Sequence, residues 1–196
     1  MYDGVLKIMN RDVLGKHYHH IWSDLNEVRK YIFAAIVLFV AGNILAIVIP
    51  TLGESVISTA LEYFKPFKDK NVLELLVAIF LNNASSTFFA IVLGFLCGLV
   101  PVFGAVFNGI AVGAIVHVNP LNVFKIIPHG LFELPAVFIA WGLGIWCAGG
   151  LFHAARLTTI IVRVKKSLNI YLFIIVPLLI IAAIVEVCCI TILFAT

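Results

Sequence analysis

Charged residues are scarce in this chain, and their scarcity excludes most soluble folds. Only 12% of the 196 residues are Asp, Glu, Lys or Arg, whereas 63% are hydrophobic, and the mean hydropathy is +1.14. A soluble domain has roughly 25% charged and about 45–50% apolar residues. The composition therefore indicates a protein that crosses a membrane several times. The net charge of +3 gives no reason to expect a nucleic-acid partner.

Metal-binding patterns are also missing, although the chain has four cysteines and six histidines. No cysteine pair has the spacing of zinc ligands, and all four lie in apolar runs, where we expect small buried side chains. These cysteines are Cys97, Cys147, Cys188 and Cys189. Three histidines close together, His17, His19 and His20, lie in a polar segment, where solvated side chains are the simpler interpretation. We therefore expect no metal and no other cofactor.

The first thirty residues lack a cleavable signal and a long apolar run. One apolar stripe recurs there at spacings of four and three, and charged residues fill the other face of the implied helix. The stripe consists of Leu14, Tyr18, Ile21, Leu25 and Val28. We predict a cytoplasmic amphipathic helix over residues 1–30 and a single transmembrane bundle over residues 31–196.

Apolar runs dominate the rest of the chain, and a run of roughly 20 residues is long enough to cross about 30 Å of hydrocarbon. A polar stretch at residues 51–71 follows the first run, and we expect one interfacial helix within it near residues 56–64. The fold class is therefore all-α integral membrane, with about five transmembrane helices plus one or two re-entrant or broken helices. The spans are predicted at residues 31–49, 86–100, 102–118, 129–151 and 170–194.

The apolar stretch of residues 72–100 is too long for one plain span and contains a polar patch at residues 82–87. We predict a short re-entrant or interfacial helix over residues 72–81, a break, and a second helix over residues 86–99. Irregular backbone at membrane depth requires protein or water to cover it, and the asparagines of the patch would supply that cover. A single long tilted helix is the alternative.

Three prolines give further expectations about the backbone. Pro101 marks a tight turn between two spans. Pro128 is placed to open a helix as its first residue, where the missing N–H costs nothing. Pro135 lies inside that helix, removes one backbone hydrogen bond and should kink it.

Basic residues gather in two segments, and the positive-inside rule makes both segments cytoplasmic. The first segment precedes the first span, and the second lies before the last span. Five crossings then place the amino terminus inside and the carboxyl terminus outside a plasma membrane. The cations are Lys7, Arg11, Lys16, Arg29 and Lys30 in the first segment, and Arg156, Arg163, Lys165 and Lys166 in the second.

Small residues recur four apart on three consecutive predicted spans, a spacing that lets helix backbones approach closely in lipid. Internal packing of a compact bundle is the simpler interpretation. The alternative is that one such face forms a homodimer, which we also expect for this protein. The residues are Gly94 and Gly98, Gly109 and Gly113, and Ala136, Ala140, Gly144 and Ala148.

Ionisable and amide side chains form a predicted polar centre within the apolar sequence. His129 and Glu133 are one helical turn apart and share a helix face. An ionisable group at membrane depth costs about 2.5–3.5 kcal/mol, so a chain that retains this pair is expected to use it. Asn82, Asn83 and Asn108 are the other expected members, whereas Glu186, near the middle of the last span, has no evident partner.

Three roles are open for this polar centre. It locks broken helices together through hydrogen bonds, it binds a proton or ion as in secondary transporters, or it holds a metal that activates water. The metal role needs three protein ligands, and only His129 and Glu133 are obvious, with His117 or Glu186 as additions.

Several of these motifs together resemble the stage II sporulation protein M family, over the chain from about residue 20 to its end. The most specific string is His129-Gly130-x-x-Glu133-Leu134-Pro135-Ala136. Asn82-Asn83, Gly94 with Gly98, and Asn108-Gly109-x-x-x-Gly113 accompany it. The resemblance implies the fold and the motif positions. The named sporulation member acts with two partners in peptidoglycan remodelling during engulfment, whereas many members occur in bacteria and archaea that do not sporulate.

We predict a membrane scaffold or component of a membrane complex, without enzymatic activity, in contact with the lipid bilayer and with other membrane proteins. A proton- or ion-coupled transporter or channel is the alternative. A metal-dependent intramembrane enzyme is the second alternative.

Overall fold

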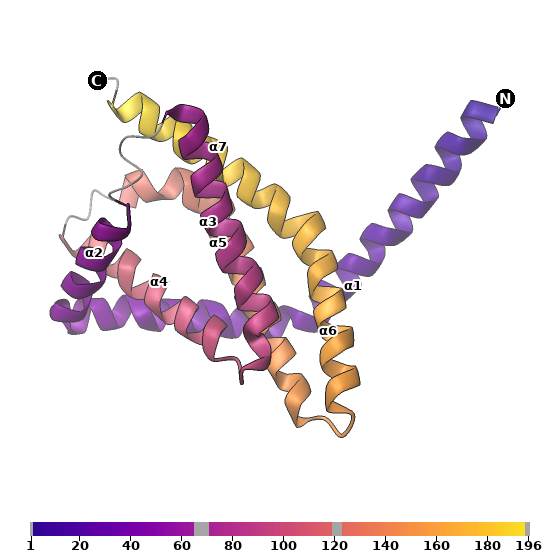
Figure 1. Cartoon of the computed structure of the whole chain (residues 1–196), viewed down its shortest axis with the longest axis horizontal. Helices are drawn as coiled ribbons and strands as arrows, with labels where there is room; N and C mark the ends of the chain where they lie inside the picture. The colour runs from indigo at the N-terminus through magenta and orange to yellow at the C-terminus, as the bar shows by residue number, and fades with distance from the viewer. Residues whose placement is uncertain (1, 65–70, 119–122, 195–196) are drawn as a thin grey trace.

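The computed structural model describes residues 2–64, 71–118 and 123–194, and every secondary-structure element in these ranges is helical (Figure 1). Within them, five helical runs are long and apolar enough to cross a membrane, which agrees with the predicted number of spans. These runs are Tyr18–Val48, Val72–Phe95, Leu99–Val118, Gly130–Phe152 and Arg156–Thr191.

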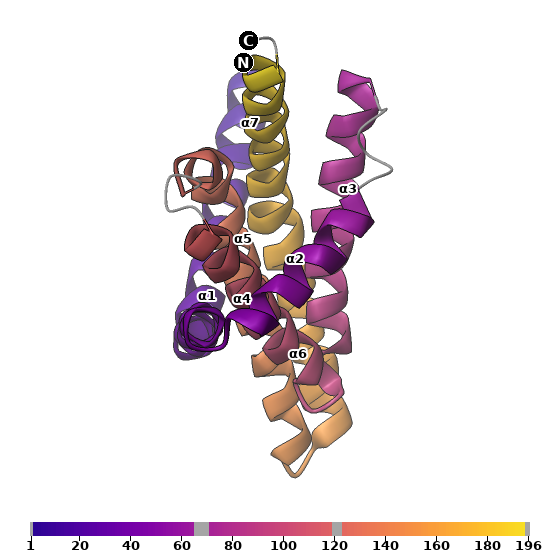
Figure 2. The ribbon, with the colours of Figure 1, turned by 90° about the vertical axis from the view of Figure 1, so that its left-hand side faces the viewer.

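The longest helix, α1 (Tyr2–Val48), passes through residue 30 without a break in its assignment. The predicted amphipathic segment and the first span are therefore one continuous helix, although its direction changes along its length (Figure 1). Two residues of the predicted apolar stripe, Ile21 and Val28, are fully buried against the bundle. Beyond Ile49, a proline opens α2 (Pro50–Phe64), which replaces the shorter interfacial helix expected at residues 56–64. Figure 2 shows α2 crossing the near side of the bundle.

The predicted break at residues 82–87 is wrong, because α3 (Val72–Val92) runs through the polar patch as one helix. Asn71 caps its first turn by accepting a hydrogen bond from the Glu74 N–H. The polar side chains of the patch bond to the helix itself: the Thr87 hydroxyl donates to the Asn83 carbonyl at 2.7 Å and to the Ala84 carbonyl at 3.0 Å. Local bonds of this kind satisfy polar groups without opening the backbone ladder.

The turn that follows α3 lies before Pro101, and not at Pro101 as the sequence predicted. A 3₁₀ turn at Leu93–Phe95 is followed by two residues with left-handed backbone, Cys97 (φ 53°) and Gly98 (φ 72°). Pro101 instead lies buried in the first turn of α4 (Leu99–Val118), where a missing N–H is harmless.

The expectation for Pro128 is also wrong, because α5 (Val123–Ala148) begins before it. Pro128 and Pro135 both lie inside α5, and each removes one backbone hydrogen bond. Figure 1 shows that α5 changes direction along its length, the behaviour expected of a proline-containing helix. His129 therefore does not occupy a first turn with free backbone N–H groups.

The carboxyl-terminal part is one long helical run. It comprises α6 (Arg156–Ile170), a π-helical turn at Tyr171–Ile175, and α7 (Val176–Phe194). Pro177 is the second residue of α7, and its missing N–H is consistent with a change of hydrogen-bond register in the preceding turn. The largest core cluster joins this run to α1 and α5 through Ile21, Leu143 and Ile175.

Glycines of the predicted small-residue pattern take part in close helix contacts within the chain. On α4, a Cβ at Gly109 would meet the Phe39 carbonyl of α1, and one at Gly113 would lie 2.7 Å from the Asn43 carbonyl. The second contact joins Gly94, at the end of α3, to Gly144 of α5. Ala136 and Ala140 are fully buried as well. A homodimer, which remains a prediction, would need a surface other than these residues.

Candidate functional site

Glu133 of α5 and Asn108 of α4 line one cavity of about 80 Å³ between α1, α4 and α5, at whose edge Asn108 is exposed. The walls come from α1, α4 and α5, and they are mostly apolar. Three aromatic or aliphatic side chains, Phe39, Val112 and Trp141, form much of the surface around the carboxyl group. Roughly 10–15 Å³ of such volume holds one water molecule, so the cavity has room for several.

The aromatic side chains in the lining of this cavity pack against one another. Trp141 lies against Phe39, with ring centroids 6.4 Å apart, and against Phe138 at 5.9 Å. Gly104 of α4 leaves room for the indole, because a Cβ there would lie 2.8 Å from Trp141 Nε1. Asn108 is held by a 2.8 Å hydrogen bond from its Nδ2 to the Gly104 carbonyl, which leaves its Oδ1 unused by that bond.

The Glu133 carboxyl accepts no hydrogen bond and forms no ion pair with any side chain in the described ranges. It is half-buried, so the prediction of a buried glutamate in the polar centre is wrong. A second carboxyl group, Glu186 of α7, is close enough to interact with it electrostatically. Glu186 is half-buried too, and α5 and α7 pack directly on each other.

The predicted partner His129 is placed only by its backbone within α5, and its side chain lies outside the described part of the structure. The hydrogen bond expected between His129 and Glu133 therefore stays a prediction. Gly130, the next residue in the motif, is buried and lines the same cavity as Glu133.

Asn82 and Asn83 lie on α3 and are not part of the lining of the Glu133 cavity. The Asn82 amide donates to Asn83 Oδ1 at 3.2 Å. Both side chains are half-buried. Of the five residues predicted for the polar centre, the structure thus brings Glu133 and Asn108 to one cavity and places the two asparagines of α3 elsewhere.

Residues that sequence reasoning missed connect α3 to the run before α7. The Tyr171 hydroxyl donates a 2.8 Å hydrogen bond to the Ala84 carbonyl, and its ring packs edge-on against Phe88 with centroids 5.7 Å apart. Nothing in the apolar run around Tyr171 singles it out, because its partner is a backbone atom 87 residues away. The contact covers the Ala84 and Thr87 side of the patch, which is buried, whereas Ser85 and Ser86 are exposed.

A metal is the least favoured of the three roles considered for the polar centre, and the side chain of His129, one of its candidate ligands, lies outside the described part of the structure. Among the described residues, no group of three His, Cys, Asp or Glu side chains is arranged to hold a metal ion. Of the cysteines, only Cys147 is buried as expected. Cys97, in the turn before α4, and Cys188 of α7 are exposed, and Cys189 is half-buried. His19 and His20 are exposed, as expected for solvated side chains.

The arrangement is suited to binding a proton or a small hydrated cation. It offers a small cavity in apolar surroundings with one carboxyl group and one amide oxygen in its lining, and a second carboxyl group, Glu186, close enough to interact with the first. Searches of curated proteins and of solved structures found no match to the chain. The model of one family, stage II sporulation protein M, matches residues 35–189. This match covers most of the chain and all the motifs around Glu133, and the protein therefore belongs to the stage II sporulation protein M family.

Proposed function

We propose that this protein binds and releases a proton at Glu133 as part of ion-coupled transport across a membrane. One observation carries the proposal: a carboxyl group lines a cavity between apolar helices and has no hydrogen-bond or ion-pair partner among the described residues. Ionisable groups that persist in such surroundings mark proton and ion pathways. The scaffold role of this site requires hydrogen bonds across helices, which the described residues do not supply.

Glu186 supports the proposal because it places a second carboxyl group near the first. Two like charges in a medium of low dielectric repel each other, and a proton or cation that neutralises one of them removes the repulsion. The cavity can hold water beside Glu133, which gives a proton a route to and from the carboxyl group. Asn108 would orient that water through its amide oxygen.

Proton movement is measurable in vesicles that contain the purified protein and a pH-sensitive dye. A potassium gradient with valinomycin makes the interior negative and draws protons inward. We expect faster acidification with the wild type than with empty vesicles, and a rate equal to that of empty vesicles with Glu133→Gln. The control is Glu54→Gln, which removes an exposed carboxyl on α2 outside the cavity. It should behave as the wild type.

Proton binding itself is testable apart from flux. Infrared spectra of the protein in lipid, recorded as a function of pH, should contain a carboxylic-acid C=O band that Glu133→Gln removes. A wild-type flux rate in Glu133→Gln would end the transport proposal. A band that persists in this variant would end the assignment of the proton to Glu133.

A scaffold role is the second candidate, and an uncovered aromatic surface favours it. Trp22 and Tyr18 of α1 are 68% and 54% exposed, although their neighbour Ile21 is buried. They lie on the segment predicted to be cytoplasmic, where a partner protein would find them. The test is a photoreactive residue placed at Trp22 in cells. The matched control is Phe33, which is 67% exposed and lies within the span predicted at residues 31–49. A scaffold predicts a specific cross-linked protein at position 22 only.

A further inference from the structure

The Glu133 cavity follows one face of α5 over several helical turns. Its lining residues on α5 recur at helical spacing, and the first and the last of them are about 16 Å apart along the helix axis. These residues are Gly130, Glu133, Leu134, Val137 and Trp141. Glu133 therefore lies towards one end of the cavity, and Trp141 lies at the other end.

Trp141 brings an unpaired hydrogen-bond donor to this cavity. Its side chain is only 3% exposed, and its indole N–H donates to no carbonyl or side chain in the described ranges. The Nε1 atom faces α4 at Gly104, where an added Cβ would lie 2.8 Å away. The Gly104 carbonyl already accepts the Asn108 amide. The polar edge of the indole thus faces the wall of the cavity that also carries Asn108.

The partner of this N–H must be a hydrogen-bond acceptor, because an indole can only donate. Buried N–H groups are almost always paired, either with protein or with ordered water. The Glu133 carboxylate is an acceptor, but about 12 Å of helix axis separates it from Trp141, too far for a direct bond. Whatever connects the two residues must accept a hydrogen at Trp141 and donate one at Glu133. Water does both, whereas a metal cation accepts no N–H hydrogen.

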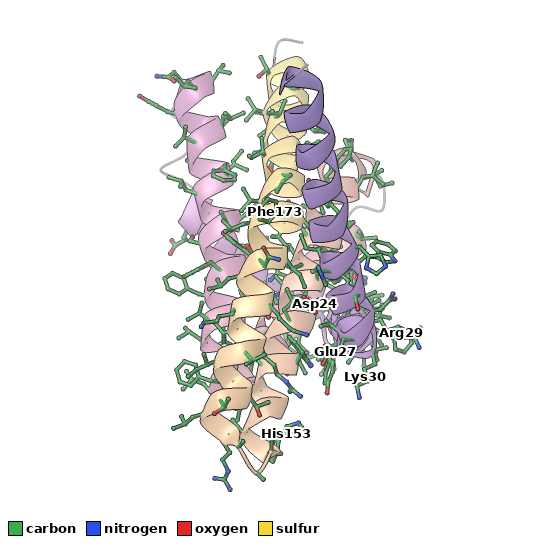
Figure 3. All side chains as sticks on the ribbon, turned by 90° about the vertical axis from the view of Figure 1, so that its right-hand side faces the viewer. Asp24, Glu27, Arg29, Lys30, His153 and Phe173 are labelled. Carbon is green, nitrogen blue, oxygen red and sulfur yellow. The ribbon has the colours of Figure 1, made fainter. Side chains whose placement is uncertain are left out.

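Trp146 is the comparison within the same helix. It is 2% exposed, and its N–H also has no acceptor in the part of the chain that the structure describes. It lines a groove of about 340 Å³ with the exposed side chains of Glu27 and His153, which Figure 3 shows towards one end of the molecule. Solvent reaches this groove and can pair with the N–H. The donor of Trp141 instead depends on what the Glu133 cavity holds.

We propose that the Trp141 indole N–H orients a short chain of water molecules that delivers protons to Glu133. The proposal rests on the proposed function and adds a residue to it. The cavity of about 80 Å³ has room for several water molecules. The water beside Trp141 accepts the N–H with its oxygen, so its own hydrogens point along the cavity towards Glu133.

Protons enter this chain at the edge of the cavity, where Asn108 is exposed. A hydronium ion at the edge gives a proton to the first water, each water passes one proton on, and the last water protonates the Glu133 carboxylate. The step consumes no water, and the indole gives up no proton. Trp141 is therefore a positioning residue.

Ultraviolet resonance Raman spectra of the protein in lipid measure the hydrogen bond of the indole directly. The chain has three tryptophans, so the difference between the wild type and Trp141→Phe isolates the signal of Trp141. We expect a hydrogen-bonded N–H that exchanges to N–D within minutes in heavy water, because water reaches it. A free N–H, or one that stays unexchanged for hours, would overturn the proposal whatever the proton flux.

Proton flux in vesicles tests the role of the donor. Trp141→Phe keeps an aromatic ring and removes the N–H, so we expect flux to fall about tenfold or more. The carboxylic-acid band of Glu133 should persist, since the carboxyl group still binds its proton at equilibrium. The matched control is Trp146→Phe, which removes a buried indole from the same helix outside the cavity and should keep wild-type flux. Equal losses in both variants would overturn the proposal in favour of packing.

The outcomes separate this inference from the transport proposal. Wild-type flux in Trp141→Phe would overturn the role of Trp141 and leave transport through Glu133 standing. A wild type without Glu133-dependent flux would overturn both. If Trp141→Phe does not fold, replacement of Trp141 by benzothienylalanine decides, because this analogue keeps the shape of the side chain and has sulfur in place of the N–H. Wild-type flux with the analogue would overturn the proposal.

Discussion

Tyr171 donates its hydroxyl hydrogen bond to the backbone carbonyl of Ala84, and this contact joins the π-helical turn before α7 to the middle of α3. The acceptor carbonyl also receives the Thr87 hydroxyl. Two helices that are far apart in the sequence are thus fastened at the polar patch of α3.

Replacing Tyr171 by phenylalanine should lower the free energy of unfolding by about 1 kcal/mol, because the ring packing persists and one buried hydrogen bond is lost. The control is Tyr31→Phe, whose hydroxyl bonds to no described residue. Unfolding in mixed detergent micelles, followed by circular dichroism, measures both. Equal stability of the two variants would show that the hydrogen bond contributes nothing.

The contact of α1 with α4 should be far more sensitive to a single methyl group. Gly109→Ala places a Cβ against the Phe39 carbonyl, so we expect a loss of about 1–3 kcal/mol as the helices separate. Gly15→Ala is the matched control, since no atom lies within 4 Å of its added Cβ, and alanine favours a helix by about 0.5–1 kcal/mol. Thermal denaturation should rank Gly15→Ala above the wild type and Gly109→Ala below it.

Removing the charge of Glu133 should leave stability unchanged or raise it. The carboxyl group has no hydrogen-bond donor among the described side chains, and Glu186 repels its charged form. We expect the thermal midpoint of Glu133→Gln to equal or exceed that of the wild type. A residue that locks helices together would instead cost about 3–5 kcal/mol on removal of one partner, which the same melting curves would reveal.

The predicted orientation is testable with two exposed positions. In a background without the four native cysteines, Lys165→Cys on α6 should react with an impermeant maleimide only after the membrane is opened. Glu54→Cys on α2 should react in intact cells. Reaction of both from the same side would contradict the topology derived from the basic segments.

The sequence predicted the helical class and the five apolar runs well, because hydropathy depends only on composition along the chain. The prediction failed where a polar side chain could bond either to its own helix or to a residue far away in the sequence. The polar patch of α3 indicated a break, yet Thr87 bonds to its own helix and Tyr171 covers the patch from another element. The positions of polar residues in the sequence do not reveal which acceptor each hydroxyl or amide group will bond.

The site was predicted in part for a similar reason. Helical spacing placed His129 and Glu133 on one face, and that inference needs only the period of the helix. The placement of Glu133 and Asn108 on one cavity depends on how α4 packs against α5, which no spacing along the chain reveals. The predicted start of this helix was wrong because Pro128 lies inside α5 and not at its first position.

The unbroken helix α1 has one further consequence. It carries Glu27, which pairs with Lys166 of α6, and Phe39, which walls the cavity of Glu133. These two residues are about 18 Å apart along the helix axis, with no loop between them. A change at the ion pair that shifts α1 would therefore also shift one wall of the Glu133 cavity. If Glu133 takes up a proton as proposed, the packing of α1 on α6 and the proton affinity are linked, and each alters the other by the same factor.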